Sequence, residues 1–174
     1  MQPSAPTQTF SYEKVMVFID GSNLFHALRR ANVKIDYRKM LDELVAGRNL
    51  VQPFFFGSVP PNPTASQIAF QKTLQMQGFE VKIFPLRSRD GRLVEKGVDV
   101  ALAVEFLVQA FNKNYDVGIL VSGDEDFRGV VGEAKRLGRK VEIASFRAST
   151  SAAFQICGNR FIALDDLLPK IKLL

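Results

Sequence analysis

The stretch VMVFIDGSN, residues Val15–Asn23, decides how this chain folds. Its first five residues are apolar, and their β-branched and aromatic side chains are typical of a parallel strand covered on both faces. Periodicity alone also allows a buried helix, but Gly21 directly after the run favours a sharp turn out of a strand. Ser22 or Asn23 can then cap the helix that follows. In open α/β sheets ligands bind beyond the carboxyl ends of the strands, so Asp20 is expected to border a binding crevice.

The rest of the chain alternates predicted strands and helices. Further strands are expected at residues 50–56, 79–84, 117–121 and 141–144, with a short last strand at 161–164. After the first helix, helices are expected at residues 36–47, 64–78, 97–112, 127–137 and 149–156. The helix at 97–112 is apolar almost all round, so we expect it to be packed against the sheet rather than lying on the surface. This order predicts an α/β protein, a three-layer α/β/α sandwich around a parallel sheet of five or six strands.

Length and composition suggest the organisation of the chain. Its 174 residues favour one domain over residues 13–174, after a proline- and serine-containing tail at 1–12 that we expect to be disordered. No apolar run approaches the roughly 18 residues of a membrane helix, and the first residues lack a signal-peptide pattern. We therefore predict a cytoplasmic protein with no membrane partner. The formal net charge of +5 fits either a polyanionic partner or a solvated basic surface.

The kinds of metal site open to this sequence are limited. Cys157 is the single cysteine and His26 the single histidine, so a Cys/His zinc cage is excluded. Both are expected to be packing or surface residues. Carboxylates are the remaining metal ligands, and they select hard cations such as Mg²⁺ or Mn²⁺.

Aspartates follow two of the predicted strands. Asp124 and Asp126 come after the strand at 117–121, by way of Ser122, in the sequence SGDEDF. If this strand lies beside the first one across the switch point, both aspartates converge with Asp20. Each aspartate taken singly is explained by helix capping, but two aspartates two residues apart exceed what one cap needs.

Asp99 adds a third segment. It lies in the first turn of the helix at 97–112, whose expected solvent stripe holds Glu105 and Gln109. At about 100° per residue, Asp99 lies roughly 120° from Glu105 and is therefore off that stripe. Either the helix dipole favours it there, or the helix end borders a polar site. Four carboxylates converging from three segments would repel one another unless a divalent cation were bound, so their convergence predicts a metal.

Basic residues could lead a polyanion to this site. The stretch 85–96, PLRSRDGRLVEK, is rich in arginine, and its Asp90–Gly91 pair predicts a turn. A solvated basic loop is the alternative interpretation. The candidate nucleic-acid-binding cations are Arg87, Arg89, Arg92, Lys96, Arg128 and Arg147.

Three motifs, FIDGSNLF, EKGVDVALAVE and SGDEDF, together resemble the NYN domain, in particular its LabA-like branch in the PIN-like nuclease superfamily. The resemblance runs over residues 14–168. It implies a PIN-like fold, a pocket that binds Mg²⁺ or Mn²⁺, and hydrolysis of RNA phosphodiester bonds by an endoribonuclease. Asp20, Asp99, Asp124 and Asp126 match the acidic, catalytic metal-site positions of the family, with Asn23 and Ser122 as polar companions.

The chemistry of these residues agrees with that resemblance. Asp20 and Asp124 would bind the metal directly, while Asp99 and Asp126 would hold the metal or its waters. The expected partner is single-stranded RNA, and a homodimer is left open. Two alternatives remain: a non-catalytic RNA-binding or regulatory module, and a Mg²⁺-dependent phosphohydrolase of a small substrate. The second would want an aspartate two residues after Asp20, where the chain has Ser22.

Overall fold

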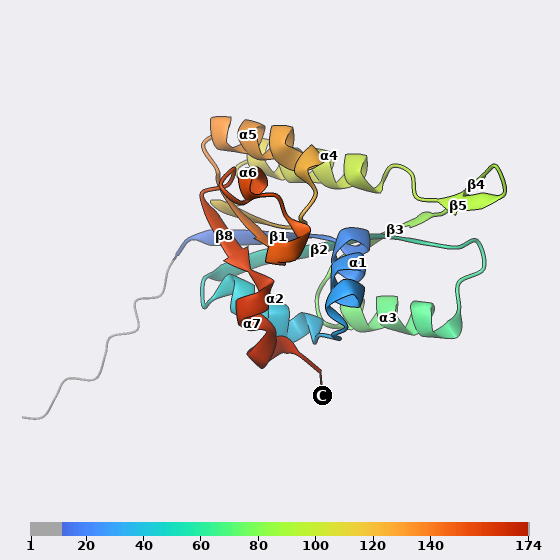
Figure 1. The fold of residues 1–174 in the computed structure, drawn as a ribbon. Coiled ribbons are helices and arrows are strands. Elements are labelled where there is room, and N and C mark those ends of the chain that lie inside the picture. The colour runs from blue at the N-terminus through green and yellow to red at the C-terminus, as the bar shows by residue number, and fades with distance from the viewer. Residues whose placement is uncertain (1–11, 174) are drawn as a thin grey trace, which may run out of the picture.

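The computed structural model describes residues 12–173 (Figure 1), so the predicted tail at residues 1–12 lies almost entirely outside the described residues. The main sheet contains β1 (Lys14–Asp20), β2 (Asn49–Val59), β3 (Glu80–Pro85), β6 (Val117–Val121), β7 (Lys140–Ser145) and β8 (Arg160–Ala163). The helices are α1 (Gly21–Ala31), α2 (Tyr37–Val45), α3 (Ala65–Met76), α4 (Val98–Phe111), α5 (Arg128–Arg136), α6 (Ala152–Gln155) and α7 (Leu164–Ile171). Short 3-10 turns lie at Glu125–Phe127 and Arg147–Ser149.

The six strands are all parallel, in the order β3-β2-β1-β6-β7-β8. The run that opens the sequence is therefore the central strand β1. It pairs with β2 on one side and with β6 on the other, where Val15 lies opposite Val117 and Ile19 opposite Val121. The strand order reverses between β1 and β6, which makes this pair the switch point of the sheet.

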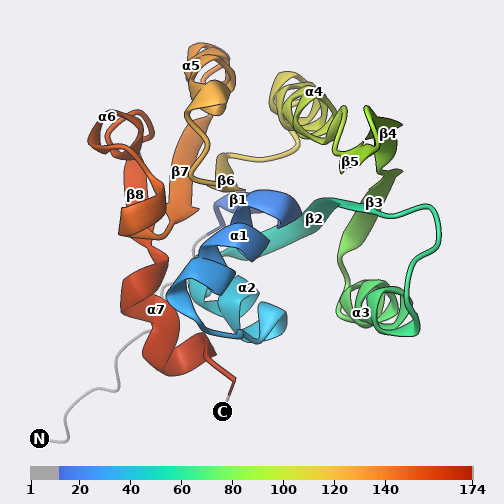
Figure 2. The ribbon, with the colours of Figure 1, turned by 45° about the vertical axis from the view of Figure 1, so that its right-hand side comes forward.

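Helices cover both faces of the sheet, as predicted. Figure 2 shows α4, α5 and α6 on one side, and α1, α2, α3 and α7 on the other. Side chains of β1 alternate between the two cores: Val17 and Ile19 pack with α1 and α2, whereas Met16 and Phe18 pack with α4 and α5. The double coverage explains why residues 15–19 of β1 are all apolar rather than alternating with polar residues.

The outer face of α4 differs from the prediction. Its inner positions, among them Leu102 and Phe106, are buried against the sheet as expected. Glu105 does not lie on an open solvent stripe, because it binds Lys82 of β3. The most exposed stripe is instead apolar and contains Val100, Val104, Val108 and Phe111. The composition of this helix indicated burial on all sides, but only one side is covered.

A separate hairpin connects β3 to α4. Its strands β4 (Arg87–Arg89) and β5 (Arg92–Val94) are antiparallel, and in Figure 1 the hairpin projects from the carboxyl edge of the main sheet. Asp90 and Gly91 have φ angles of 51° and 74°, which are the positive values of a two-residue type I′ turn. The predicted turn is confirmed. We call residues 87–96 the basic hairpin.

The C-terminal helix α7 was not predicted from the sequence. It begins at Leu164, directly after β8, and contains Pro169. Within residues 12–173, none of the helices is both long and apolar enough to cross a membrane.

Candidate carboxylate site at the switch point

Asp20 lies at the carboxyl end of β1 and is held there by two hydrogen bonds. Its Oδ2 accepts from the Ser122 hydroxyl at 3.0 Å, and its Oδ1 accepts from the backbone N–H of Asn23 at 3.0 Å. The second bond makes Asp20 itself the cap of α1, so the expectation that Ser22 or Asn23 caps this helix is wrong. The Asn23 side chain instead accepts from the N–H of Gly123 at 2.9 Å and ties the two strand ends together.

Gly21 is needed for close approach rather than for an unusual turn. A Cβ at this position would lie 2.6 Å from the carbonyl oxygen of Phe56 and would also meet the Phe55 ring. At the end of β6, a Cβ on Gly123 would meet the carbonyl oxygen of Ser149. The glycines of both motifs therefore let the strand ends pack tightly against neighbouring backbone.

Asp124 and Asp126 follow β6 as predicted. The backbone N–H of Asp124 donates to Ser122 Oγ at 3.1 Å, and Asp124 Oδ1 accepts from the N–H of Asp126 at 3.0 Å. Asp124 thus caps the short 3-10 turn before α5. Asp126 is exposed.

Asp99 lies at the first turn of α4, which starts after Gly97 in a left-handed conformation, with φ of 86°. Its side chain is exposed, yet partial burial raises its pKa, and the charges of Glu95, Asp124 and Asp126 raise it further. Asp99 therefore lies within electrostatic range of Glu95 and of the turn that follows β6.

The pKa of Asp20 is shifted more strongly. Burial raises it from the ordinary value of 3.8 to about 6. The hydrogen bonds from Asn23 and Ser122 lower the pKa, while the charges of Asp99 and Glu95 raise it. Desolvation of the carboxylate therefore outweighs the bonds that hold it.

Glu95 is a member of this group that the site prediction missed. It accepts hydrogen bonds from the hydroxyls of Ser22 and Ser58, and its charge acts on both Asp20 and Asp99. The available signal was an acid in a stretch of cations, just before the helix of Asp99. We call Asp20, Glu95, Asp99, Asp124 and Asp126 the carboxylate site.

The carboxylate site lacks compensating cations of its own. Among residues 12–173, none of its five members forms an ion pair with lysine or arginine. Carboxylate oxygens are hard donors, and a site with excess negative charge is chemically suited to Mg²⁺ or Mn²⁺. In this arrangement, however, no three metal-binding side chains of the described residues lie close enough to surround one ion. Mg²⁺ also binds through one or two carboxylates together with its own waters, so this arrangement allows a site with fewer protein ligands.

A known domain family covers most of this chain. The model of the NYN domain matches residues 14–165. This chain belongs to the NYN domain family. It is thereby placed in the PIN-like nuclease superfamily, and the three-motif resemblance found in the sequence is confirmed.

Relatives of this NYN protein have been described in other organisms. The "Low amplitude and bright protein LabA" of Synechococcus elongatus is 24% identical over 168 residues, which are 91% of this chain and 87% of LabA. An uncharacterized protein of Methanocaldococcus jannaschii is 30% identical over 153 residues, which are 88% of this chain. The match spans 56% of that relative's length.

A solved structure supports the fold. The crystal structure of a protein of unknown function from Vibrio parahaemolyticus matches with a TM-score of 0.79 and 27% identity. The match covers 96% of this chain and 100% of the other. The three-layer architecture of the NYN protein is therefore also that of an experimentally determined relative.

The predicted RNA-binding cations of the NYN protein fall into two groups. Arg87, Arg89 and Lys96 line a cavity of about 610 Å³ on the basic hairpin, together with Glu95, while Arg92 is exposed on β5. The other two cations are engaged by acids. Arg128 pairs with Glu125, and Arg147 donates to both carboxylate oxygens of Asp166, at 2.9 and 2.7 Å. The hairpin cations are therefore more available to a phosphate than Arg128 or Arg147.

Proposed function

We propose that this protein is a metal-dependent endoribonuclease that hydrolyses phosphodiester bonds of single-stranded RNA at the carboxylate site. One observation supports this above others: burial raises the pKa of Asp20 and of Asp99, neighbouring carboxylates raise both pKa values further, and no cation of the described residues pairs with either aspartate. A divalent cation bound there would supply the positive charge that the described side chains do not. The nuclease superfamily of the NYN domain supplies the reaction class.

Mg²⁺ or Mn²⁺ would be held by Asp20, Asp99 and Asp124, with Asp126 and Glu95 nearby. When bound, such an ion activates a water molecule and offsets the negative charge that develops on the phosphate. The oxygen-rich donor set matches these hard cations in type and charge.

Residues of the chain itself orient the reacting groups. The hydrogen bonds from Ser122 and Asn23 fix both oxygens of Asp20 before a substrate arrives. Above pH of about 6 this carboxylate is ionised and able to act as a ligand. Ser22 and Ser58 hold Glu95 in the same way. The basic hairpin contacts phosphates, and RNA affinity should therefore fall steeply with salt.

Cleavage of a labelled single-stranded RNA tests this proposal. The wild type should cleave with Mg²⁺ or Mn²⁺ and should be inactive in EDTA. Asp20→Asn and Asp99→Asn should each lower the cleavage rate by at least roughly 100-fold while RNA still binds, because each removes one carboxylate of the ion site.

A matched control is Asp42→Asn, an exposed aspartate on α2 that pairs with Arg38, and it should cleave like the wild type. Binding of RNA without metal-dependent cleavage would contradict the enzyme and support the alternative, a non-catalytic RNA-binding module. A melting temperature unchanged by millimolar Mn²⁺ would count against the metal site itself.

A further inference from the structure

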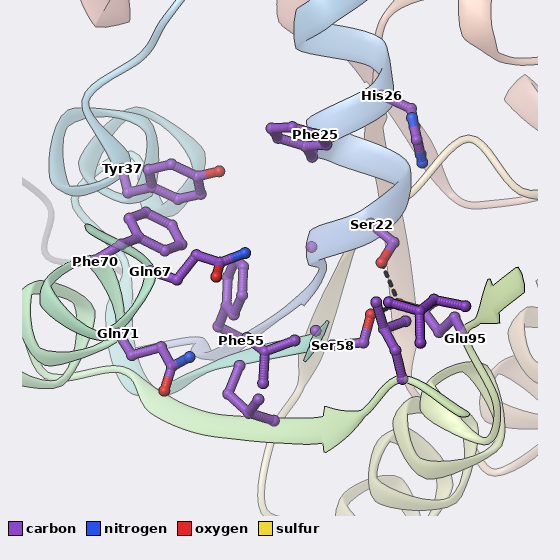
Figure 3. A pocket seen from close by; sticks show the side chains of 16 residues that line it. Ser22, Phe25, His26, Tyr37, Phe55, Ser58, Gln67, Phe70, Gln71 and Glu95 are labelled. Carbon is purple, nitrogen blue, oxygen red and sulfur yellow. Dashed lines mark hydrogen bonds between the residues drawn. The ribbon is translucent and has the colours of Figure 1, made fainter. Parts of the chain in front are cut away.

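A cavity of about 590 Å³ opens beside the carboxylate site, between α1, α2, α3, β2 and β3 (Figure 3). Four phenylalanine and tyrosine rings line it, each from a different element: Phe25 of α1, Tyr37 of α2, Phe55 of β2 and Phe70 of α3. His26 of α1 also lines it. We call it the aromatic cavity. None of these four residues is among the site residues predicted from the sequence.

Three of the rings pack against one another on one side of the cavity. Tyr37 meets Phe70 with ring centroids 5.2 Å apart and Phe55 at 5.9 Å, and Phe55 meets Phe70 at 5.7 Å. All three pairs are edge-to-face. Phe25 lines the cavity from α1 and is 53% exposed, and Phe70 is 37% exposed. A flat, apolar ligand between these rings would cover surface that the protein leaves open to water.

Polar groups without partners also line the aromatic cavity. The Gln71 amide and the Tyr37 hydroxyl form no hydrogen bond with the described residues, although other glutamines of the chain do. The side-chain oxygen Oε1 of Gln67 accepts from the backbone N–H of Thr64 at 2.8 Å, which leaves the side-chain N–H groups of Gln67 available. Burial raises the pKa of Tyr37 to about 12, so its hydroxyl stays a neutral donor. Rings with amide and hydroxyl groups beside them can stack a base and bond its edge.

The aromatic cavity is continuous with the rest of the proposed RNA path. Glu95 lines both this cavity and the neighbouring cavity of the basic hairpin. Ser22 and Ser58, which bind Glu95, also line the aromatic cavity (Figure 3). The charge of Glu95 reaches Asp20 and Asp99. Glu95 is therefore the residue at which the aromatic cavity, the cavity of the basic hairpin and the carboxylate site meet.

We propose that the aromatic cavity binds one unpaired nucleobase of the RNA strand, next to the phosphate held at the carboxylate site. This inference deepens the proposed function and rests on RNA being the substrate. Base stacking on aromatic side chains is sequence-tolerant, and the edge of an unpaired base is free to bond amides. Bases in a duplex are stacked and paired, so the cavity selects single strands.

Binding of RNA hexamers in EDTA tests the base site without any cleavage. The series contains the intact hexamer and hexamers in which one position at a time lacks its base. For the wild type, removing the base at one position should weaken binding by about 5- to 150-fold, the range for one stacked base. Phe25→Leu should weaken the intact hexamer and bind the sensitive abasic hexamer almost as the wild type does.

Two variants keep the test specific. Phe25→Tyr retains the ring and should restore the base effect. Phe111→Leu changes a phenylalanine on α4 that is even more exposed and lies outside the cavity, and it should leave binding unchanged. An equal, small effect of base removal at all positions would overturn the base site. So would equal weakening of intact and abasic RNA by Phe25→Leu, or the absence of RNA binding.

The two proposals can fail separately. A base effect without metal-dependent cleavage would contradict the endoribonuclease and leave the base site standing. Cleavage without a base effect that depends on Phe25 would contradict the base site alone.

Discussion

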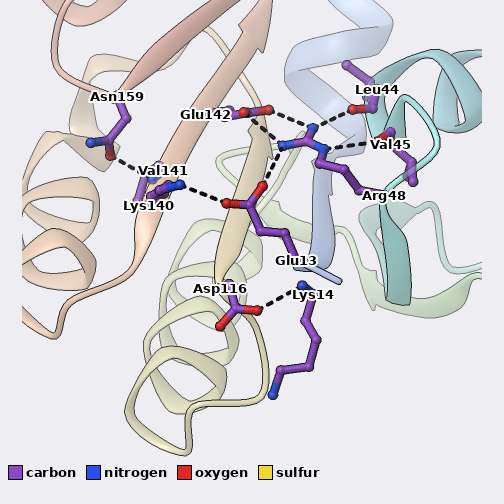
Figure 4. Close-up of polar contacts among 10 residues, drawn as sticks. All are labelled: Glu13, Lys14, Leu44, Val45, Arg48, Asp116, Lys140, Val141, Glu142 and Asn159. Carbon is purple, nitrogen blue, oxygen red and sulfur yellow. Dashed lines mark hydrogen bonds and ion pairs between the residues drawn. The ribbon is translucent and has the colours of Figure 1, made fainter. Parts of the chain in front are cut away.

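The two edges of the main sheet treat their carboxylates in opposite ways. At the amino edge, Glu142 is 8% exposed and receives two hydrogen bonds of 2.9 Å from the Arg48 guanidinium (Figure 4). Arg48 also contacts Glu13, which pairs with Lys140. At the carboxyl edge, Asp20 is 3% exposed and has no cation partner among the described residues.

The difference separates an acid that the fold itself neutralises from one that it leaves without a counter-charge. A buried carboxylate is costly unless it is paired, and at the amino edge the chain supplies the partner from its own sequence. At the carboxyl edge Asp20 accepts two hydrogen bonds but has no cation partner among the described residues, and burial still raises its pKa. Burial is nearly the same in the two places. What distinguishes them is that the fold supplies a cation for Glu142 and, among the described residues, none for Asp20.

The largest effect is expected from breaking the amino-edge pair. Arg48→Met removes both bonds to Glu142, and also those to the carbonyl oxygens of Leu44 and Val45 at the end of α2. It should lower the free energy of unfolding by about 3–5 kcal/mol, because Glu142 is left buried and unpaired. Urea unfolding measures this change.

Two further variants sharpen that result. Adding Glu142→Leu to Arg48→Met should recover much of the loss, since the uncompensated charge is then gone. Lys140→Met removes an exposed pair with Glu13 and should cost only about 0–1 kcal/mol. A loss for Arg48→Met no greater than that for Lys140→Met would show that the buried pair contributes little.

The pH dependence of stability should reveal the uncompensated acid at the other edge. In the metal-free protein, folded Asp20 keeps its proton up to pH of about 6, whereas the unfolded chain releases it near 3.8. The folded state binds more protons in this window, so the contribution of Asp20 to stability is greatest below pH of about 4 and is lost as the pH rises to about 6. The loss is about 3 kcal/mol, at about 1.4 kcal/mol per unit of pKa.

Asp20→Asn should lack this loss. The free energy of unfolding of the variant, minus that of the wild type, should therefore rise between pH 4 and pH 7 when both are measured by urea unfolding in EDTA. Parallel curves for the two proteins over this range would mean that the pKa of Asp20 is not raised in the folded state.

The smallest effect is expected at Asp99, which is exposed and accepts no hydrogen bond from the described residues. In the metal-free protein, Asp99→Asn relieves repulsion from Glu95, Asp124 and Asp126. It should raise the free energy of unfolding by no more than about 0.5 kcal/mol, and less in high salt. Thermal melting in EDTA at low and high salt measures this. A clear destabilisation would show that Asp99 has a structural partner and belongs with the amino-edge acids.

Much of the fold was predictable because the decisive residues act locally. The apolar run of β1 indicates a strand and the Asp90–Gly91 pair indicates a turn, in each case from neighbouring residues alone. Both predictions are confirmed. The α7 helix was missed because Pro169 interrupts a short segment that otherwise has a helical pattern. The exposed stripe of α4 could not be predicted, since an apolar position does not indicate whether another element covers it.

The carboxylate site was likewise predictable only in part. Asp20, Asp124 and Asp126 end neighbouring strands, so the topology alone predicts that they approach one another. Glu95 reaches the site through the fold of the basic hairpin and through contacts with Ser22 and Ser58, which are far from it in sequence. The catalytic role of the carboxylates and the RNA-binding role of the hairpin cations stay predictions. So do the cytoplasmic location and the homodimer.

The pairing of β1 with β6 has a consequence for the order in which this protein folds. The strand that ends in Asp20 is far in sequence from its partner Val117–Val121, although the two lie side by side in the sheet. Contacts between such distant segments form slowly, and until they form one edge of the apolar residues 15–19 has no partner. We therefore expect the sheet edge that carries the carboxylate site to be assembled late in folding.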